Sequence, residues 1–410
     1  MFLVKRDNSN KNFIIKGFIT SILLSAFIYL SHFNIEYLLL NTVLGLLAIY
    51  FLVTIPRKSL FITGFSTGIF WFYWIGISLQ YYELTYLIPV LLIVIGIGYG
   101  LLFLLLGLIN NIIYRVIAIF AFTFITPFGF NWMKFELLFI DSYFNTSKES
   151  FALILAAILI ISQLKRLKIL ALIPLFIAFE MPHGKIIDNP NLDIYMPQLN
   201  LSQELKWKKE NRANIIDKNL NIIENAISLN KDLVVLPETS IPTVLNNQRE
   251  LFKYLKELSL DINIFTGALY LENNQIYNAT YLFSKGEVQI AKKVVLVPFG
   301  EEIPLPKFFV NLINNTFYGG AQDYAKATNP TDFTINETKI RNAICYEATT
   351  DKIFENLGDT KYMIAISNNA WFTPSIEPTL QKLLMKYYAK KYNVTIYHVV
   401  NGSKNYIIRP

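Results

Sequence analysis

Residues 13 to 181 form a nearly continuous series of hydrophobic segments, whereas residues 183 to 410 mix polar and apolar residues as a globular domain does. Runs of this length and hydropathy are typical of membrane-spanning helices. Apolar residues make up 53% of the 410-residue chain and charged residues only 16%, which is unusual for a soluble protein. The sequence therefore predicts a transmembrane helical domain over residues 1–182 and a second domain over residues 183–410, with Pro and Gly marking the boundary.

Seven hydrophobic segments are candidate spans. They cover about residues 13–31, 35–55, 60–79, 86–109, 112–127, 151–163 and 167–181. The last three are shorter than the roughly 20 residues that a straight span needs. The first segment begins like a secretory signal, but it lacks a convincing cleavage site and another hydrophobic segment follows almost directly. This favours a retained span.

Lys and Arg residues indicate the orientation of these spans. They gather at the N-terminus and in the loops near residues 57–58, 115 and 165–168. The positive-inside rule places such loops in the cytoplasm, so seven crossings would put everything after Met181 outside. If the count of spans were wrong by one, the domain after Met181 would lie in the cytoplasm. The same loops explain the formal net charge of +7 without a nucleic-acid partner.

Aromatic residues cluster at 70–74 and again at 130–132. The favoured interpretation is a belt at the membrane interface, and the alternative is an entrance that faces lipid. Trp132 and the apolar residues among 135–140 also fit a short amphipathic arm on the outer leaflet.

From Leu192 onward, short β-type runs alternate with helical stretches, which predicts a layered α/β domain. Strands are expected over residues 193–196, 233–236, 262–271, 279–284, 288–296, 339–345, 362–367, 394–400 and 405–408. Helices are expected over residues 205–229, 248–258 and 380–392.

Cys345 is the only cysteine, so the chain has no internal disulfide. A lone cysteine is most often a small buried hydrophobe. However, Cys345 ends an apolar run, Glu238 follows the buried-looking run 233–236, and Lys293 precedes another apolar run. A carboxylate that accepts the thiol proton and an ammonium that stabilises an oxyanion would make that cysteine a nucleophile.

Other readings of these residues stay open. Taken singly, Glu238 and Lys293 are more often surface salt-bridge partners. A Cys–His pair is the main catalytic rival, and only His398 competes for that role, because His32 and His183 lie at the membrane side. The sequence has no zinc-ligand spacing and no glycine loop that cradles phosphate, so neither a metal nor a cofactor is expected.

The phrases at residues 236–238, 293–301 and 344–347 are similar to the Glu–Lys–Cys motifs of the nitrilase superfamily. Placed behind several membrane spans, they resemble the apolipoprotein N-acyltransferase family in particular. The phrases at residues 198–207, 277–278, 367–372 and 68–79 agree with that resemblance. It implies a membrane α-helical bundle joined to an α/β nitrilase-like α-β-β-α sandwich.

The resemblance also implies roles for individual residues. Glu238 would be the general base, Lys293 the oxyanion stabiliser and Cys345 the nucleophile. Supporting roles would fall to Glu301, Tyr346 and Glu347, and substrate binding to Trp207, Asn278 and Trp371. Two departures stand out: Asn369 replaces the usual Asp of its phrase, and the chain stops at Pro410 where the family usually has one more span.

The implied reaction takes an acyl chain from a phospholipid, forms a cysteine thioester, and passes the acyl group to the N-terminal amine of diacylglyceryl-cysteine in an apolipoprotein. The implied setting is the bacterial inner (cytoplasmic) membrane, with the catalytic domain on the periplasmic side. A membrane-tethered carbon-nitrogen hydrolase (amidase) with the same triad is the alternative enzyme. A membrane scaffold with a degenerate domain is the non-catalytic alternative.

Overall fold

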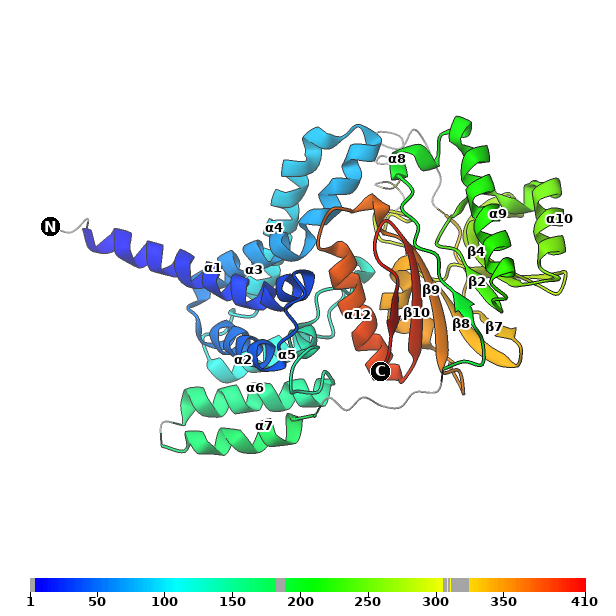
Figure 1. The fold of residues 1–410 in the computed structure, drawn as a ribbon. Coiled ribbons are helices and arrows are strands. Elements are labelled where there is room, and N and C mark those ends of the chain that lie inside the picture. Colours follow the sequence, from blue (N-terminus) through cyan, green and yellow to red (C-terminus); the bar gives the residue numbers. More distant parts are fainter. Residues whose placement is uncertain (1–3, 165, 182–188, 305–307, 309, 311–323) are drawn as a thin grey trace. The chain divides into compact units, whose positions relative to one another are not determined.

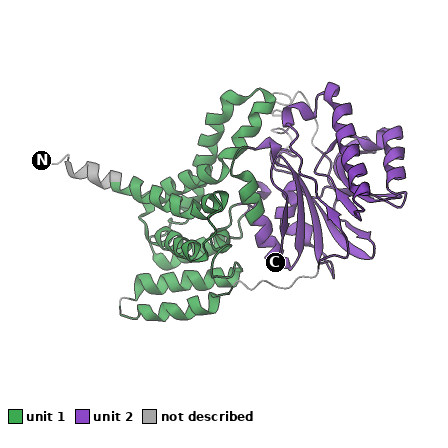
Figure 2. Cartoon of the chain, in the orientation of Figure 1, with its two compact units in different colours: residues 1–125, 133–184, 374–383 green, residues 126–132, 185–373, 384–410 purple. Residues whose placement is uncertain are grey.

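The computed structural model describes residues 4–164, 166–181, 189–304, 308, 310 and 324–410, and Figure 1 shows their fold. The chain divides into two compact units, coloured separately in Figure 2. Unit 1 comprises residues 1–125, 133–184 and 374–383, and unit 2 comprises residues 126–132, 185–373 and 384–410. The short segment 126–132 thus belongs to unit 2, although both of its neighbours along the chain lie in unit 1.

Unit 1 is helical, and each of the seven predicted hydrophobic segments contains all or part of one α-helix. These helices are α1 (Val4–His32), α2 (Leu38–Thr54), α3 (Arg57–Phe72), α4 (Ile88–Leu105), α5 (Ile112–Phe122), α6 (Lys148–Gln163) and α7 (Leu172–Ala178). Within the described residues, three stretches are long and apolar enough to cross a membrane: Asn12–His32, Arg57–Tyr82 and Thr85–Leu105. The count of seven crossings stays a prediction.

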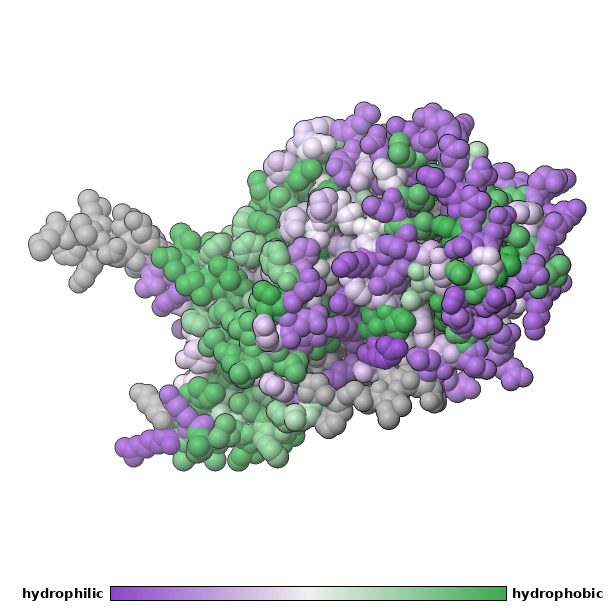
Figure 3. Space-filling model, viewed as in Figure 1, coloured by the Kyte–Doolittle hydropathy of each residue, from purple (hydrophilic) through white to green (hydrophobic). Residues whose placement is uncertain are grey.

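The outer surface of unit 1 is apolar. Figure 3 shows hydrophobic side chains over its helices, and α4 alone exposes Val90, Ile93, Val94, Ile97 and Leu101. A soluble protein rarely exposes a continuous apolar surface of this kind, whereas a helix bundle in lipid requires one.

Glycines bring α3 and α4 into close contact. A Cβ atom added at Gly68 of α3 would lie 2.8 Å from the Tyr99 Cβ atom of α4. In the same way, a Cβ atom at Gly96 or Gly100 of α4 would lie 2.7 or 2.8 Å from a phenylalanine ring of α3. Small residues four apart on facing helices are a general means of packing helices in membranes, where no hydrophobic force holds them together.

The structure contradicts part of the prediction made for the aromatic clusters. Trp71, Phe72 and Trp74 are buried inside unit 1, and Trp132 is buried inside unit 2, so these four residues form no interfacial belt. The remaining aromatic residues of the two clusters are half-buried, and for them the prediction stays open. The predicted amphipathic arm is also wrong, because its residues Phe135–Phe139 form a buried 3-10 helix, η4. The physical reason is that these aromatic rings fill the interior of their own units.

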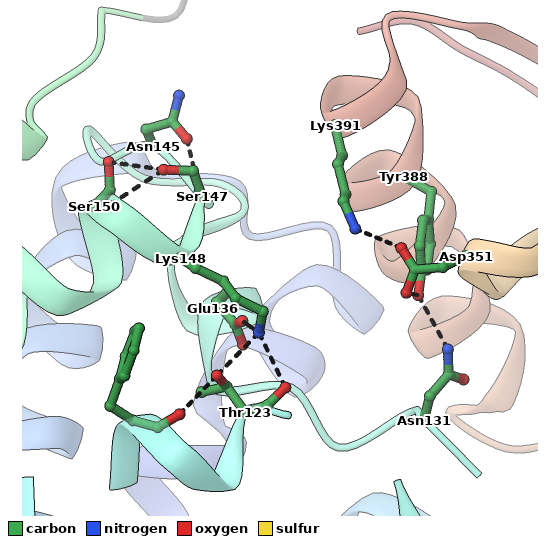
Figure 4. Close-up of polar contacts among 11 residues, drawn as sticks. Thr123, Asn131, Glu136, Asn145, Ser147, Lys148, Ser150, Asp351, Tyr388 and Lys391 are labelled. Carbon is green, nitrogen blue, oxygen red and sulfur yellow. Dashed lines mark hydrogen bonds and ion pairs between the residues drawn. The ribbon is translucent and has the colours of Figure 1, made fainter. Parts of the chain in front are cut away.

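A buried carboxylate of unit 1 is paired with a lysine. Glu136 of η4 is fully buried, and Lys148 Nζ lies 2.8 Å from its Oε1 atom. Figure 4 shows Lys148 pointing toward both Glu136 and Thr123, whose hydroxyl and carbonyl oxygens it also contacts. A buried carboxylate needs such a partner.

Unit 2 contains two mixed β-sheets. The first has the order β1-β2-β4-β5-β6, with β3 paired to β4, and the second has the order β11-β10-β9-β8-β7. The first sheet is built from β1 (Ile194–Tyr195), β2 (Leu233–Val235), β3 (Ile241–Val244), β4 (Asn263–Glu272), β5 (Gln275–Ser284) and β6 (Glu287–Lys292). The second is built from β7 (Asp332–Ile335), β8 (Thr338–Ile344), β9 (Tyr362–Asn368), β10 (Thr395–Asn401) and β11 (Tyr406–Ile408).

The two sheets pack face to face. Alternate residues of their strands share one buried core, which includes Val235, Phe265, Phe333, Ile344 and Ile366. The opposite face of the first sheet is covered by α9 (Arg212–Ser228) and α10 (Arg249–Leu258), whose residues join Val234, Ile264 and Tyr281 in a second core. The outer face of the second sheet is also buried, and the second half of α12 (Glu377–Tyr392) belongs to the same unit as this sheet. This is the predicted α-β-β-α sandwich.

Local differences from the sequence prediction matter for the site. The helix expected over 205–229 is broken, so α8 (Gln203–Lys206) is separate from α9. The strand expected over 288–296 ends at Lys292, which leaves Lys293 just beyond it. Strands β3 and β7 had no counterpart in the prediction.

Candidate active site

Cys345 lies where β8 ends. Its neighbours Ala343 and Ile344 are fully buried in the strand, and Cys345 itself begins the 3-10 helix η8 (Cys345–Thr349) and is half-buried. Its φ angle is +54°, in the left-handed region that residues other than Gly and Asn rarely adopt. Strain of this kind persists only where the surrounding structure fixes the residue, and it concentrates at functional sites.

Glu238 lies just past the end of β2 and is buried. The turn that carries it packs directly on Gly267 of the neighbouring strand β4. A Cβ atom at Gly267 would lie 2.5 Å from the Thr239 backbone nitrogen and 2.8 Å from the Glu238 Cα atom. Only glycine therefore lets the Glu238 turn approach the sheet this closely.

Lys293 is fully buried between two carboxylates. Its Nζ atom lies 2.7 Å from Glu301 Oε2 and 3.7 Å from Glu238 Oε1. Asn278 Nδ2 donates to Oε1 of Glu238 at 2.7 Å and to Oε1 of Glu301 at 3.1 Å. Burial by itself would lower the pKa of Lys293, but the charges of Glu301, Glu238 and Cys345 outweigh it and raise that pKa. Lys293 is therefore a fixed positive charge.

Glu347 links the cysteine turn to the Lys293 segment. It is fully buried, and its Oε1 atom accepts a hydrogen bond from the Ile344 backbone N–H at 2.7 Å. Its Oε2 atom accepts from the backbone N–H groups of Val294 at 2.8 Å and Val295 at 3.2 Å. Burial raises the pKa of Glu347 to about 7, against the opposing influence of Lys293 and of these N–H groups.

The segment 126–132 braces the other side of the cysteine turn. The Tyr346 hydroxyl donates to the Gly129 carbonyl at 3.0 Å and contacts Asn131 Oδ1 at 3.3 Å. Asn131 Nδ2 in turn donates to the Thr349 carbonyl and to the Tyr388 hydroxyl, both at 3.0 Å. Figure 4 shows Asn131 pointing toward Tyr388, which also contacts Asp351. The rings of Phe130 and Trp132 stack on Tyr346 as well.

A second buried lysine, Lys206, also reaches this site. Its Nζ atom donates to the Glu238 backbone carbonyl at 3.0 Å. The sequence analysis predicts no role for Lys206, although Lys206 lies in the phrase at residues 198–207 that agrees with the family resemblance. Segment 126–132 was likewise missed as part of the site, and only its polar Asn131 between two aromatic residues gave a signal.

The rival base, His398, is buried in β10 and its Nε2 atom is hydrogen-bonded to Ser367. Burial lowers the pKa of His398 to about 3, so this imidazole is neutral at physiological pH. Asn369 is also buried, with its Nδ2 atom 3.3 Å from the Ser403 hydroxyl. Trp207 is exposed at the end of α8 and Trp371 is half-buried, and their substrate roles stay predictions.

The described part of the chain holds no group of three or more His, Cys, Asp and Glu side chains placed to bind a metal ion.

An apolar helical unit joined to an α-β-β-α sandwich, with a buried Glu–Lys pair near a strained cysteine turn, defines a membrane-anchored member of the nitrilase superfamily. The family models agree with this class. Residues 11–181 match the apolipoprotein N-acyltransferase integral membrane domain, and residues 197–395 match carbon-nitrogen hydrolase.

Curated relatives cover nearly the whole chain. It is 45% identical to apolipoprotein N-acyltransferase of Wolinella succinogenes, over 95% of this chain and 94% of that protein. It is 39% identical to the Campylobacter jejuni enzyme of the same name, over 100% of this chain and 93% of that one. The chain belongs to the apolipoprotein N-acyltransferase family and is an acyltransferase with an integral membrane domain.

A solved carbon-nitrogen hydrolase superfamily protein of Xanthomonas campestris matches with a TM-score of 0.39 and 16% identity, covering 51% of this chain and 76% of that one. So low a TM-score carries no weight for the function of this chain.

Proposed function

We propose that this chain transfers an acyl chain from a phospholipid, through a thioester on Cys345, to the N-terminal amine of diacylglyceryl-cysteine in apolipoproteins. The observation that carries the proposal is the buried Lys293, which is ion-paired with Glu301 and lies 3.7 Å from Glu238. It stands in a chain that is similar to a named apolipoprotein N-acyltransferase over 95% of its length. In this proposal residues 1–182 form the membrane domain and residues 183–410 the catalytic domain.

In the first half-reaction, Glu238 takes the proton of the Cys345 thiol. The sulfur electron pair then attacks the ester carbonyl of the phospholipid, and Lys293 stabilises the oxyanion that forms. When the C–O bond breaks, the lysophospholipid alcohol leaves with the proton from Glu238, and the acyl group stays on sulfur as a thioester.

In the second half-reaction, the apolipoprotein amine attacks the thioester carbonyl. A C–N bond forms and the C–S bond breaks, Glu238 takes the amine proton, and that proton returns to sulfur. The same base and the same oxyanion site therefore serve both halves, and no co-reactant is required.

The supporting residues would fix this geometry. Glu301 holds Lys293 through their ion pair at 2.7 Å. Asn278, which the resemblance assigns to substrate binding, also donates hydrogen bonds to Glu238 at 2.7 Å and to Glu301 at 3.1 Å. Trp207 and Trp371, both with some exposure, would contact the substrates, and Tyr346 and Glu347 would shape the turn that carries the thiol.

Both substrates are lipid-anchored, so the reaction needs an enzyme held at a membrane surface. The apolar exterior of unit 1 supports this requirement. We place the protein in the bacterial inner membrane with residues 183–410 on the periplasmic side. A reporter fused after residue 185 that is active only in the cytoplasm would contradict that orientation.

The test is the acyl thioester itself. Purified full-length protein incubated with phospholipid alone should gain one acyl mass on the peptide that contains Cys345, detected by mass spectrometry. Cys345→Ala should abolish that adduct and the N-acylation of a diacylglyceryl lipopeptide. If Cys345→Ala still acylates the lipopeptide, the proposal is wrong.

An amidohydrolase is the second candidate, because residues 197–395 match the carbon-nitrogen hydrolase model. Such an enzyme would pass the acyl group from Cys345 to water. Release of free fatty acid with no acylated lipopeptide would favour it over the transferase.

A further inference from the structure

Lys206 has a position that the proposed reaction leaves unexplained. It ends the short helix α8, and only 1% of its surface is exposed. Lysine is almost never buried to this degree unless its charge is compensated. Its one described hydrogen bond goes to the Glu238 backbone carbonyl, at the turn that carries the proposed base.

The charge of Lys206 acts on the reacting groups. Burial lowers the pKa of Lys206 to about 8, while Glu238 and Cys345 both oppose that shift. Interactions of this kind are mutual, so a charged Lys206 stabilises a negative charge on Cys345. A nearby ion pair, between Glu204 of α8 and Lys208 just past the end of that helix, is exposed and is therefore screened by solvent.

The charge balance of the buried cluster indicates why a second cation is needed. Among the described residues of the site, Lys293 faces Glu238 and Glu301 directly, and Glu347 adds a carboxyl group that is half ionised near pH 7. A thiolate on Cys345 would add one more negative charge. Without Lys206, that anion would form in a cluster whose single cation is already shared by two carboxylates.

We infer that Lys206 is a positioning residue for the acyl transfer: it holds the Glu238 turn through its hydrogen bond and supplies the positive charge that allows Cys345 to ionise. The inference rests on the proposed function, since it assumes that the Cys345 thiolate is the nucleophile. Lys206 would thus act beside Glu238, Lys293 and Cys345, with the separate role of holding the Glu238 turn and compensating the charge of the thiolate.

The test is the pH dependence of Cys345 alkylation by iodoacetamide, measured on full-length protein in detergent. Cys345 is the only cysteine, so the label reports that one thiol. Lys206→Met keeps the length of the side chain but removes its charge. We expect it to shift the alkylation midpoint to higher pH by about one unit, which lowers the rate at neutral pH about tenfold.

Lys208→Met is the matched control, because Lys208 is exposed and lies two residues away. It should leave the midpoint unchanged. Lys206→Arg retains the charge and should keep the wild-type midpoint, so it tests the inference even where Lys206→Met does not fold. Two results would overturn the inference. In the first, Lys206→Met has the same alkylation midpoint as the wild type. In the second, Lys206→Arg shifts the midpoint to higher pH by as much as we expect for Lys206→Met.

Alkylation needs no acyl donor, which separates this test from that of the proposed function. If wild-type Cys345 does not react at any pH below the pKa of a free thiol, Cys345 is not the proposed nucleophile, and the inference fails with it. If wild-type Cys345 is reactive and Lys206→Met matches it, the inference alone fails.

Discussion

Removing the Glu347 carboxylate should destabilise unit 2 because three backbone N–H groups would lose their acceptor. These groups belong to Ile344, Val294 and Val295, at 2.7, 2.8 and 3.2 Å from the carboxylate oxygens. The first lies at the end of β8 and the other two lie just after Lys293. Glu347→Ala therefore breaks the link between the turn that carries Cys345 and the segment that follows Lys293.

The magnitude follows from the cost of leaving buried donors unpaired, about 1–3 kcal/mol each. Water that enters the vacated space would satisfy some of them, so we expect about 3 kcal/mol of lost stability at neutral pH. That is a large part of the roughly 5–15 kcal/mol that holds a domain folded.

The stability of the wild-type protein should also depend on pH through Glu347. Burial raises the pKa of Glu347 from its ordinary value of 4.5 to about 7, so the folded state holds a proton that the unfolded state has released between these values. The neutral carboxyl thus contributes stability that is fully present below about pH 4.5 and is lost as the pH rises through 7. The difference is about 3 kcal/mol, and Glu347→Ala should abolish it.

Thermal unfolding in detergent, followed by circular dichroism from pH 5 to pH 8, would measure both effects. The gap between wild type and Glu347→Ala should widen as the pH falls. Glu355→Ala is the control, since Glu355 is exposed and pairs only with Lys352 among the ion pairs described. If Glu347→Ala unfolds at the same temperature as Glu355→Ala at every pH, the assigned role of these three hydrogen bonds is wrong.

Three further changes test other parts of the fold and site. Arg341→Lys should cost about 3 kcal/mol in denaturant unfolding, because the buried guanidinium pairs with Asp332 and also donates to three backbone carbonyls, which an ammonium cannot all reach. Gly267→Ala should lower acyl transfer at least tenfold in a lipopeptide assay, because its Cβ atom would lie 2.5 Å from the Thr239 nitrogen and displace the adjacent turn. Tyr346→Phe should lower the unfolding temperature by the equivalent of about 1 kcal/mol, since it removes one hydroxyl while keeping the stacked ring.

Most of the sandwich was predictable because its strands are short and strongly apolar. The run at residues 233–236 became β2 and the run at 339–345 became β8 followed by Cys345. The two missed strands lack that signal: β3 includes Pro242, and β7 is a four-residue strand that begins with Asp332. Short strands with a proline or a charge acquire their structure from pairing with a neighbour, which sequence periodicity does not encode.

The site was predictable only in part, because some of its contacts join residues far apart in the sequence. Glu238 and Cys345 stand at the ends of apolar runs, where sequence reasoning looks for functional side chains. Gly267 and Lys206 reveal their roles only through the close approach of their neighbours in space. The aromatic residues near 71 and 132 were misread because composition distinguishes poorly between a ring that faces lipid and a ring that fills a core.

The contacts of η8 explain how unit 2 can hold Cys345 in a backbone conformation that is unfavourable for an L-residue. On one side, the Glu347 carboxylate binds the turn to the segment that follows Lys293. On the other side, Tyr346 and Thr349 are bound by Asn131 of segment 126–132. A φ angle of +54° at a cysteine costs of order 1 kcal/mol or more, so one hydrogen bond would barely offset it, whereas bonds from both sides leave the turn no relaxed alternative. In the proposed mechanism, a cysteine fixed in this way would reorganise little between the two half-reactions, so that one oxyanion site can serve both.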